Sequence, residues 1–146
     1  MLLLVLLLAL TACGVRPTVP IEGGPAPTEE ITVGTVLYLL EGTTLTRVVR
    51  PQPRANALEL LAAGPTRDER AEGLTTEIPS SAAPITAVMS TTGITVRISS
   101  GLKDLSPLGQ SQLVCTAVPP ARIPMTEVIL TDPTVTLPPQ RCPFTA

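Results

Sequence analysis

Histidine and tryptophan are both absent from the 146 residues of this chain. Without histidine the chain has no Ser-His-Asp or Cys-His catalytic group, and it lacks the commonest metal ligand. The formal net charge is only −2, and no basic stripe is present, so we expect no nucleic-acid partner. These absences remove the most frequent classes of catalytic and metal-binding site.

The remaining polar residues form no catalytic pattern. Gly23-Gly24 is an isolated pair rather than a glycine-rich phosphate loop, and Glu29-Glu30 lie in a segment where nothing would bury a carboxyl group. The serines have neither a histidine nor a neighbouring lysine motif to activate them. We therefore expect a protein that is not an enzyme and that holds no cofactor and no metal ion.

Aromatic side chains are nearly absent, since the chain has only Tyr38 and Phe144. The core must therefore be built from Leu, Val, Ile and Ala, which bury less area per residue than aromatic rings. A chain of 146 residues has room for one domain. Its 17 prolines and 10 glycines argue against a helical bundle and favour strands and loops.

An apolar run from Leu2 opens the chain and ends at Leu10-Thr11-Ala12-Cys13. The run has the length of a signal-peptide core and is well short of the roughly 20 residues that a membrane-spanning helix needs. Its end resembles a lipobox, in which an aliphatic and two small residues precede a cysteine that is lipidated before cleavage. The resemblance implies a signal peptide over residues 1–12 and lipid attachment to Cys13. The alternatives are a plain secretory peptide with an incidental cysteine, and a buried apolar helix.

A lipidated Cys13 would carry a diacylglycerol, whose two acyl chains, such as palmitate, insert into the membrane. Each buried methylene contributes about 0.8 kcal/mol, and two chains together give stable anchoring. Residues 13–32 are rich in proline and glycine and indicate a tether. We therefore expect the mature protein on the extracytoplasmic face of the cell membrane.

Regular structure is predicted from residue 35 onward. Two strand-like runs, 35–40 and 44–50, flank a turn and predict a hairpin. Residues 55–63 have apolar side chains at helical spacing, and Gly64-Pro65 ends that helix. Thr66 and Glu69 then fit a capping box, and Gly73 closes the short helix that it begins.

The second half of the chain repeats this alternation of strands and helices. Residues 85–89 and 94–98 predict a second hairpin, and Ser106-Pro107 predicts the start of a helix over 107–117. Residues 128–130 and 135–137 flank Asp132-Pro133 and predict a third hairpin. The order ββααββαββ indicates an α/β (α+β) domain. We expect a single mixed, mainly antiparallel sheet with two or three helices packed on one face.

This order and several local strings resemble the GerMN domain of bacterial envelope lipoproteins and of sporulation and germination proteins. The resemblance covers about residues 35–138, within a domain placed at 33–138. The strings that carry it are Tyr38, Leu45, Val48, Arg50, Leu60 to Thr66, Glu69, Gly73-Leu74, Ile78-Pro79, Val96 to Ser99, Gln112 to Val114 and 128–135. Its most specific residues are Gly64, Pro65, Thr66, Glu69 and Gly73. The resemblance implies a non-catalytic module related to ring-building parts of envelope assemblies, and hence an interaction role.

Cys115 and Cys142 are the two cysteines that remain if Cys13 carries lipid. Disulfides persist outside the cytoplasm, and two remaining cysteines are the number needed for one disulfide. This disulfide would tie a C-terminal tail, residues 139–146, to the helix over 107–117. The alternative is that Cys115 is a buried free thiol and Cys142 a reactive one.

Two functions are compatible with these features. The first is a lipid-anchored interaction domain that binds another envelope protein as an accessory of an envelope process. The alternative is a lipoprotein that binds a small molecule or a cell-wall fragment on its threonine-rich strand faces, and a concave, partly apolar pocket would distinguish it. An enzyme is the least favoured reading.

Overall fold

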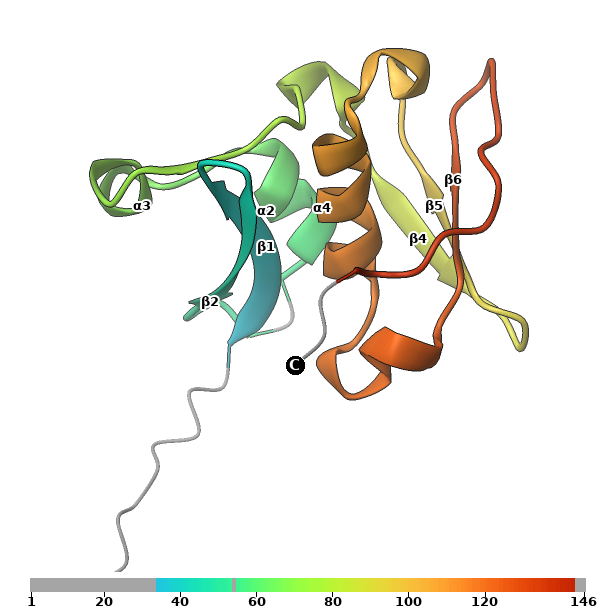
Figure 1. The fold of residues 1–146 in the computed structure, drawn as a ribbon, viewed down its shortest axis with the longest axis horizontal. Coiled ribbons are helices and arrows are strands. Elements are labelled where there is room, and N and C mark those ends of the chain that lie inside the picture. The colour runs from blue at the N-terminus through green and yellow to red at the C-terminus, as the bar shows by residue number, and fades with distance from the viewer. Residues whose placement is uncertain (1–33, 54, 144–146) are drawn as a thin grey trace, which may run out of the picture. The chain divides into compact units, whose positions relative to one another are not determined.

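The structure is a computed structural model that describes residues 34–53 and 55–143 (Figure 1). They belong to one unit, Thr32–Ala146. The predicted signal peptide, the predicted tether and Cys13 lie outside the described residues. Within the described part, no helix is both long and apolar enough to cross a membrane.

The first sheet is built on the predicted N-terminal hairpin, which the structure confirms. Strands β1 (Thr35–Glu41) and β2 (Thr44–Arg50) pair antiparallel over their whole length, in a register that places Glu41 opposite Thr44. A two-residue strand that the sequence did not predict, β3 (Leu74–Thr75), pairs antiparallel with the end of β1. The strand order is therefore β2-β1-β3.

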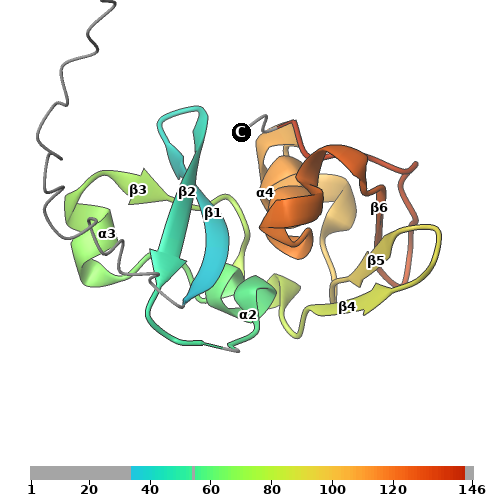
Figure 2. The ribbon, with the colours of Figure 1, turned by 90° about the horizontal axis from the view of Figure 1, so that it is seen from below.

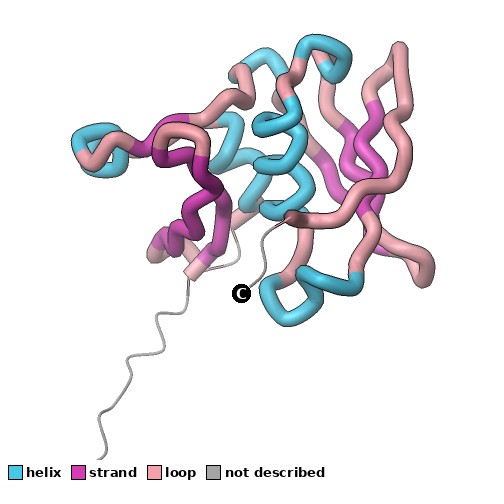
Figure 3. Tube along the Cα trace, in the orientation of Figure 1, coloured by secondary structure: helices cyan, strands magenta, loops and turns pink. Residues whose placement is uncertain are grey.

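The second sheet contains the second predicted hairpin. Strands β4 (Thr86–Met89) and β5 (Ile94–Arg97) are antiparallel, whereas β6 (Val128–Thr131) runs parallel to β5. Parallel neighbours need a long crossover, and the chain between β5 and β6 contains the longest helix of the domain (Figure 3).

The structure has three α-helices, and two of them begin at the predicted caps. Helix α2 (Ala57–Ala62) starts after Asn56, whose side chain accepts from the backbone N–H of Leu58. Helix α3 (Arg67–Ala71) has the predicted capping box, and α4 (Pro107–Ala117) has the predicted serine cap with proline at its first turn. Short 3-10 helices occur at η1 (Ser80–Ala82), η2 (Leu102–Asp104) and η3 (Pro120–Met125).

The prediction of a single sheet is wrong, because the strands form two separate three-stranded sheets. Helix α4 lies between them and contacts β1 on one side and β5 and β6 on the other (Figures 1 and 2). Five consecutive residues of α4, 112–116, are buried. Since an α-helix turns every 3.6 residues, this run is enclosed all round, so the helix is a central layer rather than a cover on one face.

Side chains of α4 take the place of a neighbouring strand along β1. In the β1–β2 register, Tyr38 directs its backbone groups away from β2, and β3 is too short to reach them. The N–H of Tyr38 donates to Thr116 Oγ1 at 3.1 Å, and its carbonyl accepts from Gln112 Nε2 at 3.0 Å. Gln112 Oε1 also accepts from the backbone N–H of Glu77 at 2.9 Å. Beyond the short β3, the edge of β1 is therefore completed by a helix rather than by a strand.

One hydrophobic core joins both sheets and α4, and most elements contribute members to it. Leu37 and Leu39 enter it from β1, Leu61 from α2, and Val96 from β5. As expected, aliphatic residues dominate, with Tyr38 as the one aromatic member.

The third predicted hairpin is correct in its turn and wrong in its second strand. The chain reverses after β6 at Asp132-Pro133, but residues 135–137 form no strand, because their pairing is limited to an isolated bridge between Thr131 and Thr136. A second isolated bridge joins Val128 to Gln140. The returning chain thus lies along β6 without extending the sheet.

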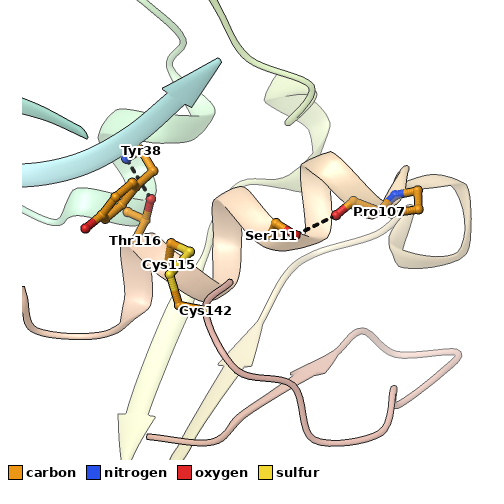
Figure 4. The surroundings of a disulfide bond; sticks show 6 residues. All are labelled: Tyr38, Pro107, Ser111, Cys115, Thr116 and Cys142. Carbon is orange, nitrogen blue, oxygen red and sulfur yellow. Dashed lines mark hydrogen bonds between the residues drawn. A yellow bond between two sulfur atoms is a disulfide. The ribbon is translucent and has the colours of Figure 1, made fainter. Parts of the chain in front are cut away.

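A disulfide joins Cys115 on α4 to Cys142 in the C-terminal segment (Figure 4). Both cysteines are buried within the core. The bond therefore fastens the returning chain to the central helix, as the cysteine count predicted.

Replacing Gln112 with leucine should lower the free energy of unfolding. The substitution leaves the buried carbonyl of Tyr38 and the amide of Glu77 without their partner. We expect a loss of about 2–4 kcal/mol in urea unfolding monitored by circular dichroism. Gln110→Leu, at a half-buried position of the same helix, is the control and should cost about 1 kcal/mol or less. Equal losses in the two variants would contradict this role for Gln112.

Reduction of the disulfide should also destabilise the domain. The bonded cysteines are 27 positions apart, and the chain-entropy model gives about 3–4 kcal/mol for a loop of this length. Urea unfolding of the same protein with and without reductant measures the difference without changing a side chain. Thiol labelling without reductant should find Cys115 and Cys142 unreactive, and two reactive thiols would rule the bond out.

Candidate functional site

The predicted site residues at the N-terminus, Leu10, Thr11, Ala12 and Cys13, lie outside the described residues. The five residues that were predicted as most specific for the family resemblance lie together on the connection from α2 through α3 to β3. They are Gly64, Pro65, Thr66, Glu69 and Gly73.

Glu69 holds the connection to the first sheet through Arg50, the last residue of β2. Arg50 donates from Nε to Glu69 Oε1 at 3.0 Å and from Nη2 to Glu69 Oε2 at 2.7 Å. The same guanidinium donates to the carbonyls of Leu60 at 3.2 Å and Gly64 at 2.8 Å. Arg50 is buried. The fork geometry of arginine thus ties β2, α2 and α3 together at one point.

The environment of Glu69 favours its ionised form. Burial raises the pKa of this carboxyl group, but hydrogen bonds from Arg50 and from the backbone N–H of Thr66, with the charge of Arg50, outweigh burial. The pKa therefore lies below its usual value. Both oxygens of the Glu69 carboxylate accept hydrogen bonds, and the ionised group is not a proton donor at neutral pH.

Two glycines of the motif are required by the backbone. Gly64 follows α2 with φ of 82°, and Gly73 follows α3 with φ of 85°. Both angles lie in the left-handed region, which costs little only for glycine and which commonly ends a helix. The positive φ angles account for the two glycines, and the ion pair with Arg50 accounts for Glu69. These residues therefore have structural roles.

Asp132 is a second acidic residue that is used for structure. Its Oδ1 accepts from the backbone N–H groups of Thr134 and Val135 and from the Thr134 hydroxyl at 2.7–2.8 Å, while Oδ2 accepts from the N–H of Leu102 at 3.0 Å. The Thr134 hydroxyl contributes most to lowering the pKa of Asp132 to about 2, and burial opposes this shift. Asp132 therefore joins the turn after β6 to η2.

A hollow of about 340 Å³ lies beside Asp132 on the described surface. Its lining comes from η2 and the neighbouring loops and is partly apolar, but it contains no large aliphatic and no aromatic residue. Ligand pockets are usually at least about 300 Å³ and mainly apolar. Among the described residues, no group of three or more Cys, Asp or Glu side chains could hold a metal ion.

The exposed apolar residues of the described chain gather on β4. Val88 and Met89 are 65% and 59% exposed, and no other large hydrophobic residue is exposed among the side chains described, which leave out those of residues 123–125. All four residues of β4 are exposed, and Figure 2 shows the strand at the rim of its sheet. The hairpin prediction located this strand, but it did not show that its side chains remain uncovered.

The two described sheets have four outer edges, and β4 is the edge that lacks protection. Strand β2 carries an exposed charge at Arg47, and β3 is only two residues long. The returning chain after β6 covers that edge through its bridges at Gln140 and Thr136. Charge, shortness and cover are the usual means of keeping a sheet edge from pairing with another chain. Strand β4 carries no charged residue, and no strand covers its outer edge.

The backbone of β4 has free hydrogen-bonding positions at Ala87 and Met89. The N–H of Ser90 donates to the carbonyl of Gly93, so Ser90, Val88 and Thr86 direct their backbone groups toward β5. Ala87 and Met89 then direct theirs toward the outer edge, where the sheet has no further strand. This row of donors and acceptors is a template for an added strand.

Helix α2 covers the beginning of the same edge. The outward N–H of Ile85 donates to Glu59 Oε1 at 2.7 Å, and its carbonyl accepts from Asn56 Nδ2 at 3.3 Å. The open part of the edge is therefore limited to Ala87 and Met89.

No protein family, no curated protein and no solved structure matches the chain in the comparisons made.

Replacing Glu69 with glutamine should lower stability and reduce its dependence on pH. Because the folded pKa lies below the unfolded value, taken as 4.5, the carboxylate stabilises the fold above that pH and loses this effect as the pH falls through the folded pKa. We expect a loss of about 3 kcal/mol at pH 7 and a smaller difference between the two proteins in acid.

Urea unfolding at pH 7 and at several values below 4.5 measures this effect. Asp132, with a pKa of about 2, is present in both the wild type and the Glu69→Gln variant and affects both in acid. The quantity compared is therefore the difference between their free energies of unfolding at each pH. Glu72→Gln, exposed at the end of the same helix, is the control. A constant difference at every pH would contradict the role given to the Glu69 charge.

Proposed function

We propose that this protein is a lipid-anchored extracytoplasmic lipoprotein whose folded domain acts by binding another envelope protein. The observation that carries the proposal is the open edge of β4, where Val88 and Met89 are exposed beside unpaired backbone groups. A strand added there would gain main-chain hydrogen bonds and bury both side chains.

The use of the acidic residues agrees with a non-catalytic role. Glu69 is bound by Arg50 and Asp132 by backbone amides, so neither is available as a general acid or base. The resemblance of the motif around Gly64 and Thr66 to GerMN domains supports an interaction role as well.

Membrane attachment is supported by the residues that precede Cys13. We assign Leu10, Thr11 and Ala12 to a lipobox and the proline-rich residues 13–32 to a tether that lets the domain reach a neighbour. The protein would then serve an envelope process from a fixed place on the membrane surface.

A Cys13→Ala variant of the full chain tests the anchor. Wild-type protein should remain in the membrane fraction and give an N-terminal peptide whose mass includes a diacylglycerol, whereas the variant should lack this mass and leave the membranes. Fractionation with mass spectrometry of the N-terminal peptide measures both. An unmodified wild-type peptide, or wild-type protein in the culture medium, would contradict the proposal.

Crosslinking in the same membranes tests the interaction. Val88→Lys puts a charge on the open edge, so it should abolish the crosslinked products of the wild-type chain. Thr44→Lys, at an exposed position of β2, is the matched control and should retain them. Identical products from both variants would show that β4 is not the binding surface.

A further inference from the structure

The residues along the open edge of β4 are complementary to a second copy of themselves. From Ile85 to Ile94 the chain has no charged residue, so two copies brought together at this edge do not oppose like charges. The outward groups of Ala87 and Met89 supply two donors and two acceptors. Such a set is its own complement across a twofold axis.

We infer that β4 pairs antiparallel with β4 of a second copy, so that the two sheets join into one six-stranded sheet. The inference rests on the proposed function, because it names the protein that occupies the same edge. It also fits the proposed anchor, since two tethered copies lie on the same membrane surface and meet at a raised effective concentration.

The geometry of the edge favours a register centred on Val88. With Val88 opposite Val88 of the second copy, Ala87 lies opposite Met89 in both halves, and all four outward backbone groups of each strand are paired. A register centred on Ala87 would place Met89 opposite Ile85 of the second copy, whose backbone is already taken by Asn56 and Glu59. Helix α2 therefore excludes that alternative.

The side chains also fit this register. Val88 lies opposite Thr95 of β5, on the sheet face opposite to that of buried Ile94 and Val96. The two Val88 side chains would meet at the axis on this face and cover each other. On the other face, the long side chain of Met89 would lie against the small one of Ala87.

Cysteine substitution at the axis tests the register. Val88 and its counterpart form a pair without mutual hydrogen bonds, for which the Cα atoms are about 4.5 Å apart, within the range of a disulfide. We expect full-length Val88→Cys protein, oxidised in its own membranes, to run as a dimer on a non-reducing gel and as a monomer after reduction.

Thr86→Cys is the matched control on the same strand and the same face. In the proposed register its two copies are four residues apart along the pair, about 13 Å, which is too far for a disulfide. We expect at least a tenfold lower yield of dimer from this variant. Equal yields from the two variants, or no dimer from Val88→Cys, would overturn the inference.

Val88→Lys supplies a second measurement, made by crosslinking in the protein's own membranes. Two lysines at the axis repel, so this variant should give no crosslinked dimer of the chain, whereas the wild type and Thr44→Lys should give one. A wild type that gives no crosslinked dimer also overturns the inference. If that wild type still crosslinks through β4 to a different envelope protein, the proposed function stands, and if it gives no crosslinked product, both fall.

Discussion

The fold depends on the hydrogen bonds through which α4 completes the edge of β1. Buried backbone groups must be paired, and Tyr38 lies where the first sheet would otherwise continue into another strand. Gln112 and Thr116 supply the missing donor and acceptor from a helix. Because a helix takes the place of a strand here, α4 lies between the two sheets. The Cys115–Cys142 disulfide then holds the C-terminal segment against the same helix. Each later element is positioned relative to α4.

The charged residues of the domain are used to hold this arrangement together. Arg50 and Glu69 join three elements at one buried point, and Asp132 closes the turn after β6. The protection of the sheet edges is unequal. Strand β2 carries a charge and β6 is covered, while β4 has an uncharged edge and two exposed apolar side chains. The proposed interaction role follows from this inequality.

An anchored protein with a short open edge needs little affinity in solution. The edge of β4 offers two residues for pairing, which is a small contact for two freely diffusing molecules. Lipid anchoring would confine the copies to one surface, and a tether of about 20 residues would let their domains reach each other. The proposed anchor at Cys13 and the proposed pairing at Val88 thus support each other physically.

Local structure in this protein could be predicted from the order of its residues. Both hairpins before residue 100, the caps at Thr66 and Ser106, the turn at Asp132 and the pairing of Cys115 with Cys142 depend on neighbouring residues or on a count, and each was predicted. The division into two sheets, the parallel β5–β6 pair and the ion pair between Arg50 and Glu69 join residues far apart in the chain. These features and the exposure of β4 became known from the tertiary structure. Burial and long-range pairing depend on which elements meet in space, and they leave no periodic signal in the residues themselves.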